Sequence, residues 1–199
     1  YPNYGYNPSG HMYTLLIWMG EDVNGQDLKN HQWVPGMEGY RQANWNYAWY
    51  NNPWFGANHY QKEYNSDLLN AQLKLAYEFD EQFRLQLRGS GVLKSNFEDL
   101  ESPKSYFNYS APREGSYQTW NTRRLNIDYD VLATYDNSIS EDFKIVVNAG
   151  ASTFYRRYQQ EFAATDGLTV PGVYNMGNST GPVRAENNLW KKAINSVYG

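Results

Sequence analysis

The sequence contains no cysteine, only three histidines and no long apolar run. Without cysteine, the chain has neither a disulfide framework nor a thiolate metal site. The longest apolar stretch, MYTLLIWM at 12–19, is much shorter than the roughly 18–20 residues that a membrane-spanning helix needs. Lysine and arginine form no large cluster and the net charge is -4, so we expect no nucleic-acid partner.

Signatures of catalysis are also missing. The sequence has no HExxH or GxSxG motif and no thiol nucleophile, so we expect no enzyme, no catalytic residue and no cofactor. The segment EDVNGQD at 21–27 has oxygen donors around Gly25, but its spacing fails the calcium-loop pattern, and we interpret it as a solvated turn. Asp128 and Asp130 share a strand face and resemble a glycosidase pair only superficially. We therefore predict no metal site.

What the sequence does contain is an excess of aromatic residues. Tyrosine, tryptophan and phenylalanine make up 17% of the 199 residues, beside 22 asparagines. Disordered chains are poor in aromatic side chains, so we expect this chain to be folded.

Apolar and polar residues alternate with a period of two between Leu69 and Tyr155, which predicts β-strands. In the first run, for example, Leu73 is expected to face one side and its neighbour Lys74 the other. The expected strands are 67–79, 83–94, 118–135, 143–157 and 189–199. Tight turns join them at one end, and long loops, 95–117 and 158–188, at the other.

Two all-β architectures fit this alternation. A soluble antiparallel sandwich is the commoner one, but its strands usually run about 5–6 residues, and the runs here are longer. A transmembrane barrel strand needs roughly 9–11 residues, with apolar side chains toward lipid, polar ones toward the lumen and aromatic residues at both interfaces. Aromatic pairs flank both tight turns, Phe79 with Phe83 and Tyr135 with Phe143. We therefore predict an all-β fold whose antiparallel strands belong to a transmembrane β-barrel.

Residues 1–66 differ in character from the rest. HMYTLLIWMG at 11–20 predicts either a short helix or a buried strand, which periodicity does not separate. Beyond it no regular element is evident, and we interpret the region as an ordered, aromatic-rich extracellular loop system. Its crowded rings are Trp33, Tyr40, Trp45, Tyr47, Trp49, Tyr50, Trp54, Phe55 and Tyr60.

Six segments, ordered along almost the whole chain, carry a resemblance to a known family. They are GHMYTLLIWMGEDVNGQDL (10–28), HQWVPG (31–36), NNPWF (51–55), LLNAQLKLAYEFDEQFRLQLRG (68–89), LTVPGVYNMGNS (168–179) and KKAINSVYG (191–199). Together they resemble the barrel portion of SusC/RagA-type TonB-dependent outer-membrane transporters of Bacteroidetes. The hairpin alone is common to outer-membrane barrels, whereas the conjunction of LLIWMG, NPWF, VPGVYNMGNS and NSVYG is fairly specific.

The resemblance implies a 22-stranded barrel around an N-terminal plug, in the Gram-negative outer membrane. It implies non-catalytic import of oligosaccharides or peptides, with a SusD-like lipoprotein over the extracellular mouth and energy relayed by TonB. This sequence contains neither the plug nor the TonB-contacting segment. The expected partners are thus the rest of the same barrel, outer-membrane lipid, the SusD-like lipoprotein and the substrate, with the TonB complex contacted through regions absent here.

The aromatic loop is the feature best suited to bind substrate. Tryptophan and tyrosine rings stack on sugars or clasp peptide side chains, and asparagine amides satisfy polar groups, although most of these rings must be structural. The named candidates are Trp45, Trp49, Trp54, Asn51 and Asn52. The alternative is a set of arginines near the outer strand ends, which could bind anionic substrate groups or pair with nearby acids or lipopolysaccharide phosphates. These are Arg123, Arg124, Arg156 and Arg157.

The number of expected strands indicates whether the sequence is a whole protein or a section of a longer one. Four full strands and a fifth begun cannot close even an eight-stranded barrel, the smallest of the transmembrane kind. The chain starts at Tyr1 without a methionine or a signal sequence. We expect an internal section of a longer chain. The rival hypothesis is a complete secreted or surface-located carbohydrate-binding β domain, and an enzyme ranks third.

Overall fold

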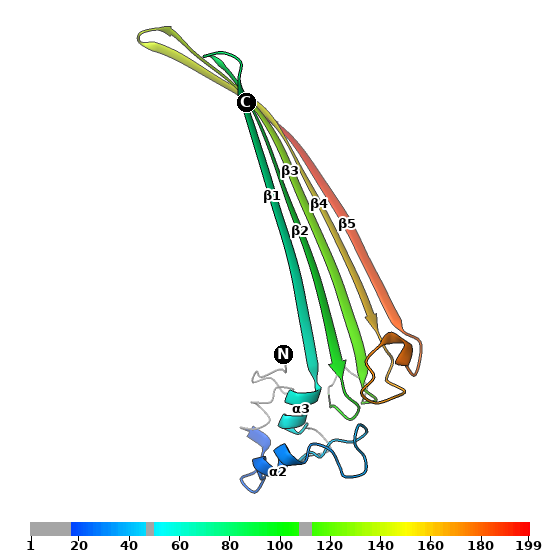
Figure 1. Ribbon diagram of the computed structural model, residues 1–199. Coiled ribbons are helices and arrows are strands. Elements are labelled where there is room, and N and C mark those ends of the chain that lie inside the picture. The colour runs from blue at the N-terminus through cyan, green and yellow to red at the C-terminus, as the bar shows by residue number, and fades with distance from the viewer. Residues whose placement is uncertain (1–16, 47–49, 108–112) are drawn as a thin grey trace. The chain divides into compact units, whose positions relative to one another are not determined.

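The computed structural model describes residues 17–46, 50–107 and 113–199. Its main feature is one open sheet of five antiparallel strands that lie side by side in chain order (Figure 1). The strands are β1 (Gln61–Glu78), β2 (Phe83–Ser102), β3 (Ser116–Ser140), β4 (Phe143–Ala164) and β5 (Arg184–Tyr198). The prediction of antiparallel β-structure is confirmed at this level.

The strands are longer than the sequence pattern indicates. β2 continues to Ser102 instead of ending near residue 94, and β3 begins at Ser116. The connections expected at 95–117 and 158–188 therefore shrink to 103–115 and 165–183. The segment SNFEDLES at 95–102 explains the difference, because it has polar residues on both faces. The backbone ladder continues there while the apolar alternation that reveals a strand is lost.

Side chains alternate between the two faces of the sheet along each strand. Polar contacts between neighbouring strands connect residues of the same parity. Ser66 contacts Asn96 (2.8 Å), Arg88 contacts Asp130 (2.5 Å) and Thr153 contacts Asn195 (3.0 Å). Even-numbered strand residues thus share one face, here called the even face. Odd-numbered residues share the other, the odd face.

A tight turn joins β1 to β2. The Asp80 carboxylate accepts hydrogen bonds from the backbone N–H groups of Gln82 (2.8 Å) and Phe83 (2.7 Å). The rings of Phe79 and Phe83 lie 5.2 Å apart across the turn. Only Glu141 and Asp142 separate β3 from β4. Short connections at this end of the strands therefore match the sequence prediction.

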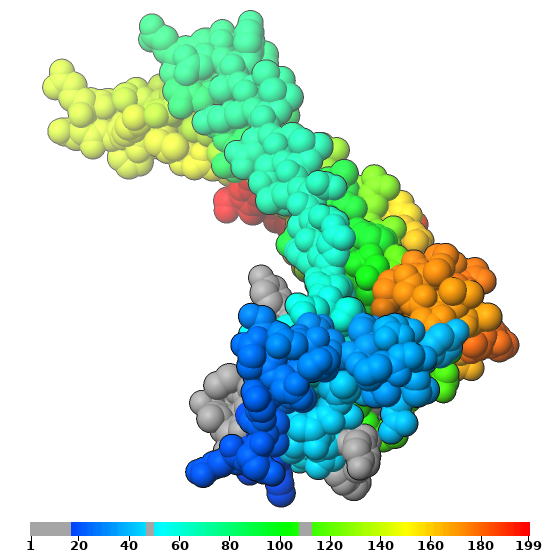
Figure 2. Space-filling model, turned by 60° about the horizontal axis from the view of Figure 1, so that its bottom comes forward, coloured from blue at the N-terminus to red at the C-terminus, as the bar shows by residue number. Residues whose placement is uncertain are grey.

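The chain divides into two compact units. The loop unit contains the described residues of 1–65, 97–120 and 161–186, and the sheet unit contains 66–96, 121–160 and 187–199. The loop unit includes α2 (Gly25–Asn30), α3 (Pro53–His59) and the 3-10 turn η2 (Met176–Asn178). In Figure 2 the blue atoms of residues 17–46 gather against the cyan atoms that include α3.

The expectation that no regular element lies between Trp33 and Tyr60 is wrong at α3. Asn52 caps this helix and Pro53 takes its first position, where a missing backbone N–H costs nothing. Most of the stretch 11–20, expected to be a helix or a strand, lies outside the described residues.

The hydrophobic core is confined to one unit. Among the described residues, the buried hydrophobic side chains are Phe55, Tyr106, Ala164 and Leu168, and all four belong to the loop unit. The described part of the sheet unit therefore has no buried apolar residue of its own. No helix in the described ranges has the length and apolar character to cross a bilayer.

Candidate functional site

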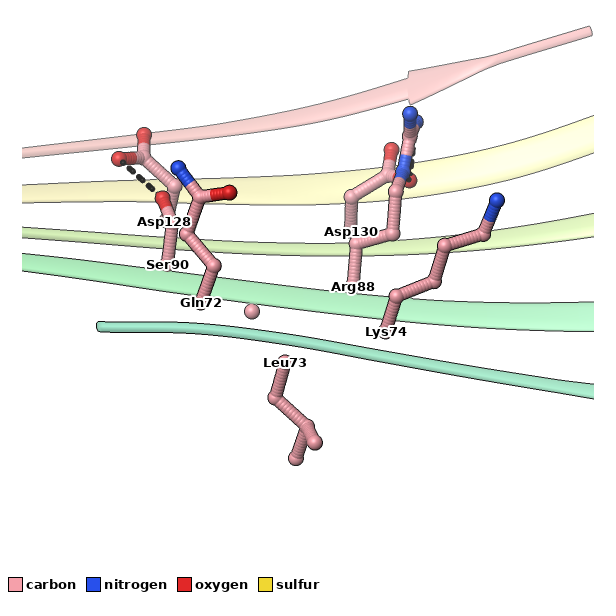
Figure 3. Close-up of a pocket in the computed structure, with 8 residues that line it drawn as sticks. Gln72, Leu73, Lys74, Arg88, Ser90, Asp128 and Asp130 are labelled. Atoms are coloured by element: carbon pink, nitrogen blue, oxygen red, sulfur yellow. Dashed lines mark hydrogen bonds and ion pairs between the residues drawn. The ribbon is translucent and has the colours of Figure 1, made fainter.

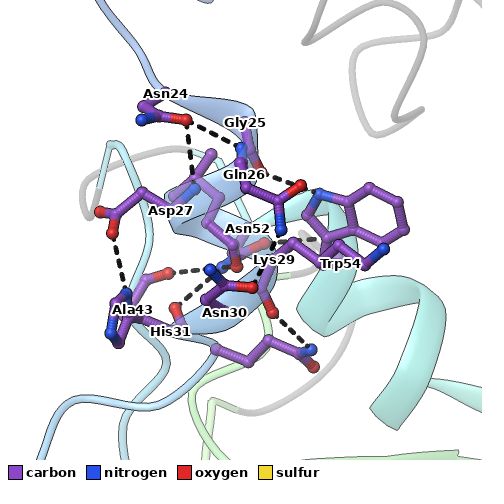
Figure 4. Close-up of polar contacts among 12 residues, drawn as sticks. Asn24, Gly25, Gln26, Asp27, Lys29, Asn30, His31, Ala43, Asn52 and Trp54 are labelled. Atoms are coloured by element: carbon purple, nitrogen blue, oxygen red, sulfur yellow. Dashed lines mark hydrogen bonds and ion pairs between the residues drawn. The ribbon is translucent and has the colours of Figure 1, made fainter.

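Asn52 is a fully buried junction within the loop unit (Figure 4). Its side-chain oxygen accepts hydrogen bonds from the backbone N–H groups of Trp54 (2.9 Å) and Phe55 (3.4 Å), which caps α3. Its side-chain nitrogen donates to the carbonyls of Leu28 (2.8 Å), Ala43 (2.8 Å) and His31 (3.4 Å). One amide therefore ties the start of α3 to the end of α2 and to the segment around Ala43.

Asn51 plays a similar part beside it. Its amide donates to the Phe107 carbonyl (2.8 Å) and accepts from the Phe107 N–H (2.7 Å), as a neighbouring strand would. Gln42, which is buried, donates to the Asn51 side chain (2.7 Å) and accepts from the Asn52 N–H (2.9 Å). Both candidate asparagines thus serve the protein's own backbone. Their role in substrate binding stays a prediction.

The candidate tryptophans differ in their surroundings. The Trp45 ring stacks on Tyr50 with 5.3 Å between centroids, and its indole N–H is buried with no hydrogen-bond partner in the described ranges. Trp54 is 39% exposed, donates to the Gly25 carbonyl (3.2 Å) and has the Lys29 ammonium 5.0 Å from its ring centroid. Trp49 lies outside the described residues. Of the two candidate rings that the structure describes, Trp54 therefore has the more accessible surface.

Other rings of the region pack against one another. Trp33 meets Phe55 edge-on at 4.7 Å, and Tyr60 stacks on Tyr106 at 4.3 Å between centroids. The His59 ring lies 5.0 Å from Phe55, and burial lowers the pKa of its imidazole. Burial likewise raises the pKa of the Tyr106 phenol above its usual range. These rings form the interior of the loop unit, as expected for most of the aromatic excess.

The even face of the sheet unit is charged, and several of its charges are paired. A hollow of about 470 Å³ lies on this face. In Figure 3, Leu73 alone among the labelled lining residues points to the other side of the sheet. Arg88 pairs with Asp130 (2.5 Å), while Ser90 donates to Asp128 (3.4 Å). Elsewhere on the face, Arg84 pairs with Glu78 (2.9 Å) and Lys144 with Asp136 (2.9 Å). Asp128 and Asp130 thus have separate partners.

The arginines toward the start of β3 and the end of β4 are held by aromatic rings. Arg124 lies over Tyr158 at 5.2 Å, and Tyr158 stacks on Trp190 at 5.7 Å. Arg156 lies over Phe154 at 4.9 Å. A hollow of about 590 Å³ is lined here by Arg124, Asn126, Arg156, Arg157, Tyr158 and Trp190. Arg123 borders a separate, smaller hollow of about 90 Å³ with Leu125, Arg157 and Gln159.

The odd face of the sheet unit is apolar and exposed. Leu73 is 64% exposed and Tyr77 63%. Further exposed odd-face residues are Leu69, Leu75, Leu87, Tyr129, Tyr135, Phe143, Val147, Leu189 and Val197. Phe79 and Phe83 flank the β1–β2 turn, and Phe143 directly follows the β3–β4 turn. The expectation that Tyr135 flanks the β3–β4 turn is wrong, because β3 continues to Ser140 and the Tyr135 hydroxyl contacts Gln82 of the β1–β2 turn.

Comparison with known proteins gives a likeness of fold. No protein-family model matches the chain, and no curated protein matches it. The chain is similar to a chain in the structure of the RagAB peptide importer in the "open-open" state, with a TM-score of 0.53 and 16% identity. The match covers 74% of this chain and 16% of that chain, so this sequence spans less than a fifth of its length. At this identity the likeness concerns the arrangement of the strands.

Proposed function

We propose that this chain forms part of the wall and mouth of a SusC/RagA-type, TonB-dependent outer-membrane importer. The observation that carries the proposal is the contrast between the exposed apolar odd face and the charged even face of the same sheet. In β3 the apolar odd-face residues run from Leu125 to Tyr135, which matches the roughly 9–11 residues of a tilted transmembrane strand. Lipid would cover the odd face, and the lumen would lie on the even face.

The free energy gained by burying the apolar side chains of the odd face favours a lipid cover over exposure to water. Burying a leucine or phenylalanine side chain is worth about 1.5–3 kcal/mol. A handful of such residues equals the net stability of a typical domain, about 5–15 kcal/mol. A soluble carbohydrate-binding domain would pack this face against a second layer, but the described sheet unit buries no apolar residue. The membrane hypothesis therefore accounts for the face better than the soluble rival does.

The proposed activity is import without catalysis. Substrate, an oligosaccharide or a peptide, would be captured between the loop unit and a SusD-like lipoprotein and released through the lumen. TonB would supply the energy through regions of the protein outside this section. The likeness to a peptide importer supports peptides as one of the two cargo classes. Among the described candidates Trp45, Trp54, Asn51 and Asn52, the exposed ring of Trp54 is the group most available to a substrate.

Neighbouring cysteines test the membrane assignment directly. The sequence has no cysteine, so Leu73→Cys and Lys74→Cys each place one thiol in this section, on opposite faces of β1. In outer membranes containing the full-length protein, we expect a water-soluble maleimide to label the even-face cysteine and a lipid-soluble one to label the odd-face cysteine. Leu87→Cys and Gln86→Cys repeat the comparison on β2. Equal labelling of both faces by the water-soluble reagent would contradict the assignment.

Uptake tests the transport activity itself. Cells with the full-length protein should accumulate labelled peptides or oligosaccharides, and accumulation should stop when TonB is deleted or the proton gradient is collapsed. Uptake that continues without TonB would exclude this class of importer.

A further inference from the structure

The arginines that line the hollow beside Tyr158 have different neighbours from several other cations of the even face. Arg84, Arg88 and Lys144 each have a carboxylate within 3 Å. Arg124 and Arg156 have no ion-pair partner among the described residues and lie over aromatic rings instead. Arg124 and Arg156 therefore carry positive charge that no carboxylate of the described residues neutralises.

The guanidinium groups of Arg124 and Arg156 donate no hydrogen bond to another described residue and lie about 5 Å from ring centroids. A guanidinium carries its five N–H donors in its plane. A guanidinium whose donors have no acceptor in the protein can bind a carboxylate with two parallel hydrogen bonds. Arg124, Tyr158 and Trp190 belong to β3, β4 and β5, so the ring contacts fix the group across three neighbouring strands.

The remaining lining suits the rest of a small ligand. Trp190 is 41% exposed and offers an apolar surface beside the arginines, while Asn126 supplies an amide with both a donor and an acceptor. The volume of about 590 Å³ lies within the usual range for small-molecule sites, roughly 300–1,000 Å³.

We propose that this hollow is a binding subsite for a carboxylate group of the transported substrate, with Arg124 and Arg156 as its anion-binding residues. The inference rests on the proposed import function and specifies which cargo the pore favours. The carboxylate can come from an acidic peptide or from an acidic oligosaccharide, since both present the same planar anion. Trp190 and Tyr158 would hold the adjoining apolar part of either cargo.

The test compares matched charged and uncharged ligands on the purified full-length complex. The probes are a hexapeptide of alternating alanine and glutamate, its glutamine counterpart, trigalacturonic acid and the methyl ester of that sugar. For the wild type, at least one acidic probe should bind more tightly than its uncharged counterpart. In Arg124→Gln/Arg156→Gln that preference should fall roughly tenfold to a hundredfold, the range for charge-assisted hydrogen bonds.

Matched controls separate the effect of positive charge inside the hollow from the effect of positive charge elsewhere on the sheet. Arg123→Gln removes the same charge one residue away, on the odd face, and Lys74→Gln removes one beside the hollow of Figure 3. Both controls should keep the acidic preference within about twofold, because neither side chain lines the hollow and salt screens exposed charges. A preference confined to the peptide, or to the sugar, supports the subsite and identifies the source of the carboxylate.

Two outcomes would overturn the proposal. One is equal affinity of the wild type for every charged and uncharged pair. The other is a loss in Arg124→Gln/Arg156→Gln that is the same for charged and uncharged probes. If neutral cargo is still imported in a TonB-dependent way, only the carboxylate subsite fails. If the strands do not span the membrane or no uptake depends on TonB, the import function itself fails.

Discussion

Asn52 shows how a residue in a recognisable motif can be structural. Its amide caps α3 and also satisfies carbonyls at the end of α2 and at Ala43, all within the buried interior of the loop unit. Asn178 does the same in the loop before β5, where it donates to Val170 (2.8 Å) and Val173 (2.7 Å). Both asparagines lie in segments that carry the family resemblance. The resemblance in these segments thus includes residues that fix the loop backbone.

Replacing Asn52 should therefore loosen the loop unit. In Asn52→Ala, α3 loses its cap and buried carbonyls lose their donor, so we expect a cost of about 3 kcal/mol in the free energy of local opening. Amide hydrogen exchange of α2 and α3 in the full-length protein measures this cost. Asn58→Ala, which removes an exposed amide bonded to Gln32, serves as the control with an expected change under about 0.5 kcal/mol. Equal effects of the two substitutions would contradict the role assigned to Asn52.

His59 makes the loop unit sensitive to acid. Burial lowers the pKa of its imidazole in the folded state, so the unfolded state binds a proton more readily once the pH falls below about 6.5. Stability should be highest above that pH and fall as the pH drops toward the lowered pKa. In His59→Gln this dependence should disappear. Protease resistance of the loop unit between pH 7.5 and 5 is the measurement, and an unchanged pH profile in the variant would contradict the prediction.

At the scale of elements, Tyr198 of β5 reaches β3 by passing over Gly150 of β4. The Tyr198 hydroxyl on β5 donates to Asp130 on β3, so its ring crosses β4 at Gly150. A Cβ at Gly150 would lie 2.5 Å from the ring carbon that bears the hydroxyl. The glycine therefore makes room for the aromatic ring, an arrangement that pins the register of neighbouring strands.

A methyl group at Gly150 should break this arrangement. Gly150→Ala should lower the melting temperature because the ring must move away from Asp130. In a Tyr198→Ala background the same change should be neutral or stabilising, since glycine weakens a strand when nothing needs the space. Gly91→Ala on β2 is the control, because a Cβ there meets no atom within 4 Å. Thermal melts in detergent measure these changes in melting temperature. Additive effects of Gly150→Ala and Tyr198→Ala would contradict the proposed contact between the two residues.

The sequence predicts some of these elements and not others, for physical reasons. Alternation assigns Leu73 and Lys74 to the correct faces because a strand sends consecutive side chains to opposite sides. The Asn52-Pro53 pair carried a signal for α3 that the aromatic crowding obscured. The contacts of Tyr198 with Asp130 and of Asn52 with Leu28 had no local signal. They depend on strand register and on chain segments far apart in sequence.

At the scale of the whole molecule, the two edges of the sheet decide between a section and a complete domain. β1 and β5 each have a single neighbour among the described strands. An edge strand of an antiparallel sheet leaves every second backbone N–H without a partner. Within a bilayer each such group costs several kcal/mol, and for this reason membrane barrels are closed.

If this sheet belongs to a closed barrel, further strands must pair with β1 and β5 in the full-length protein. We therefore expect the backbone amides of β1 and β5 to exchange with deuterium as slowly as those of β3, which has neighbours on both sides. Hydrogen exchange read by mass spectrometry in lipid nanodiscs makes the comparison within one sample, with β3 as the internal control. Fast exchange at alternate residues of β1 and β5, beside slow exchange in β3, would mean open edges. The barrel would then give way to a free-standing five-stranded sheet, whose apolar odd face would need a cover other than lipid.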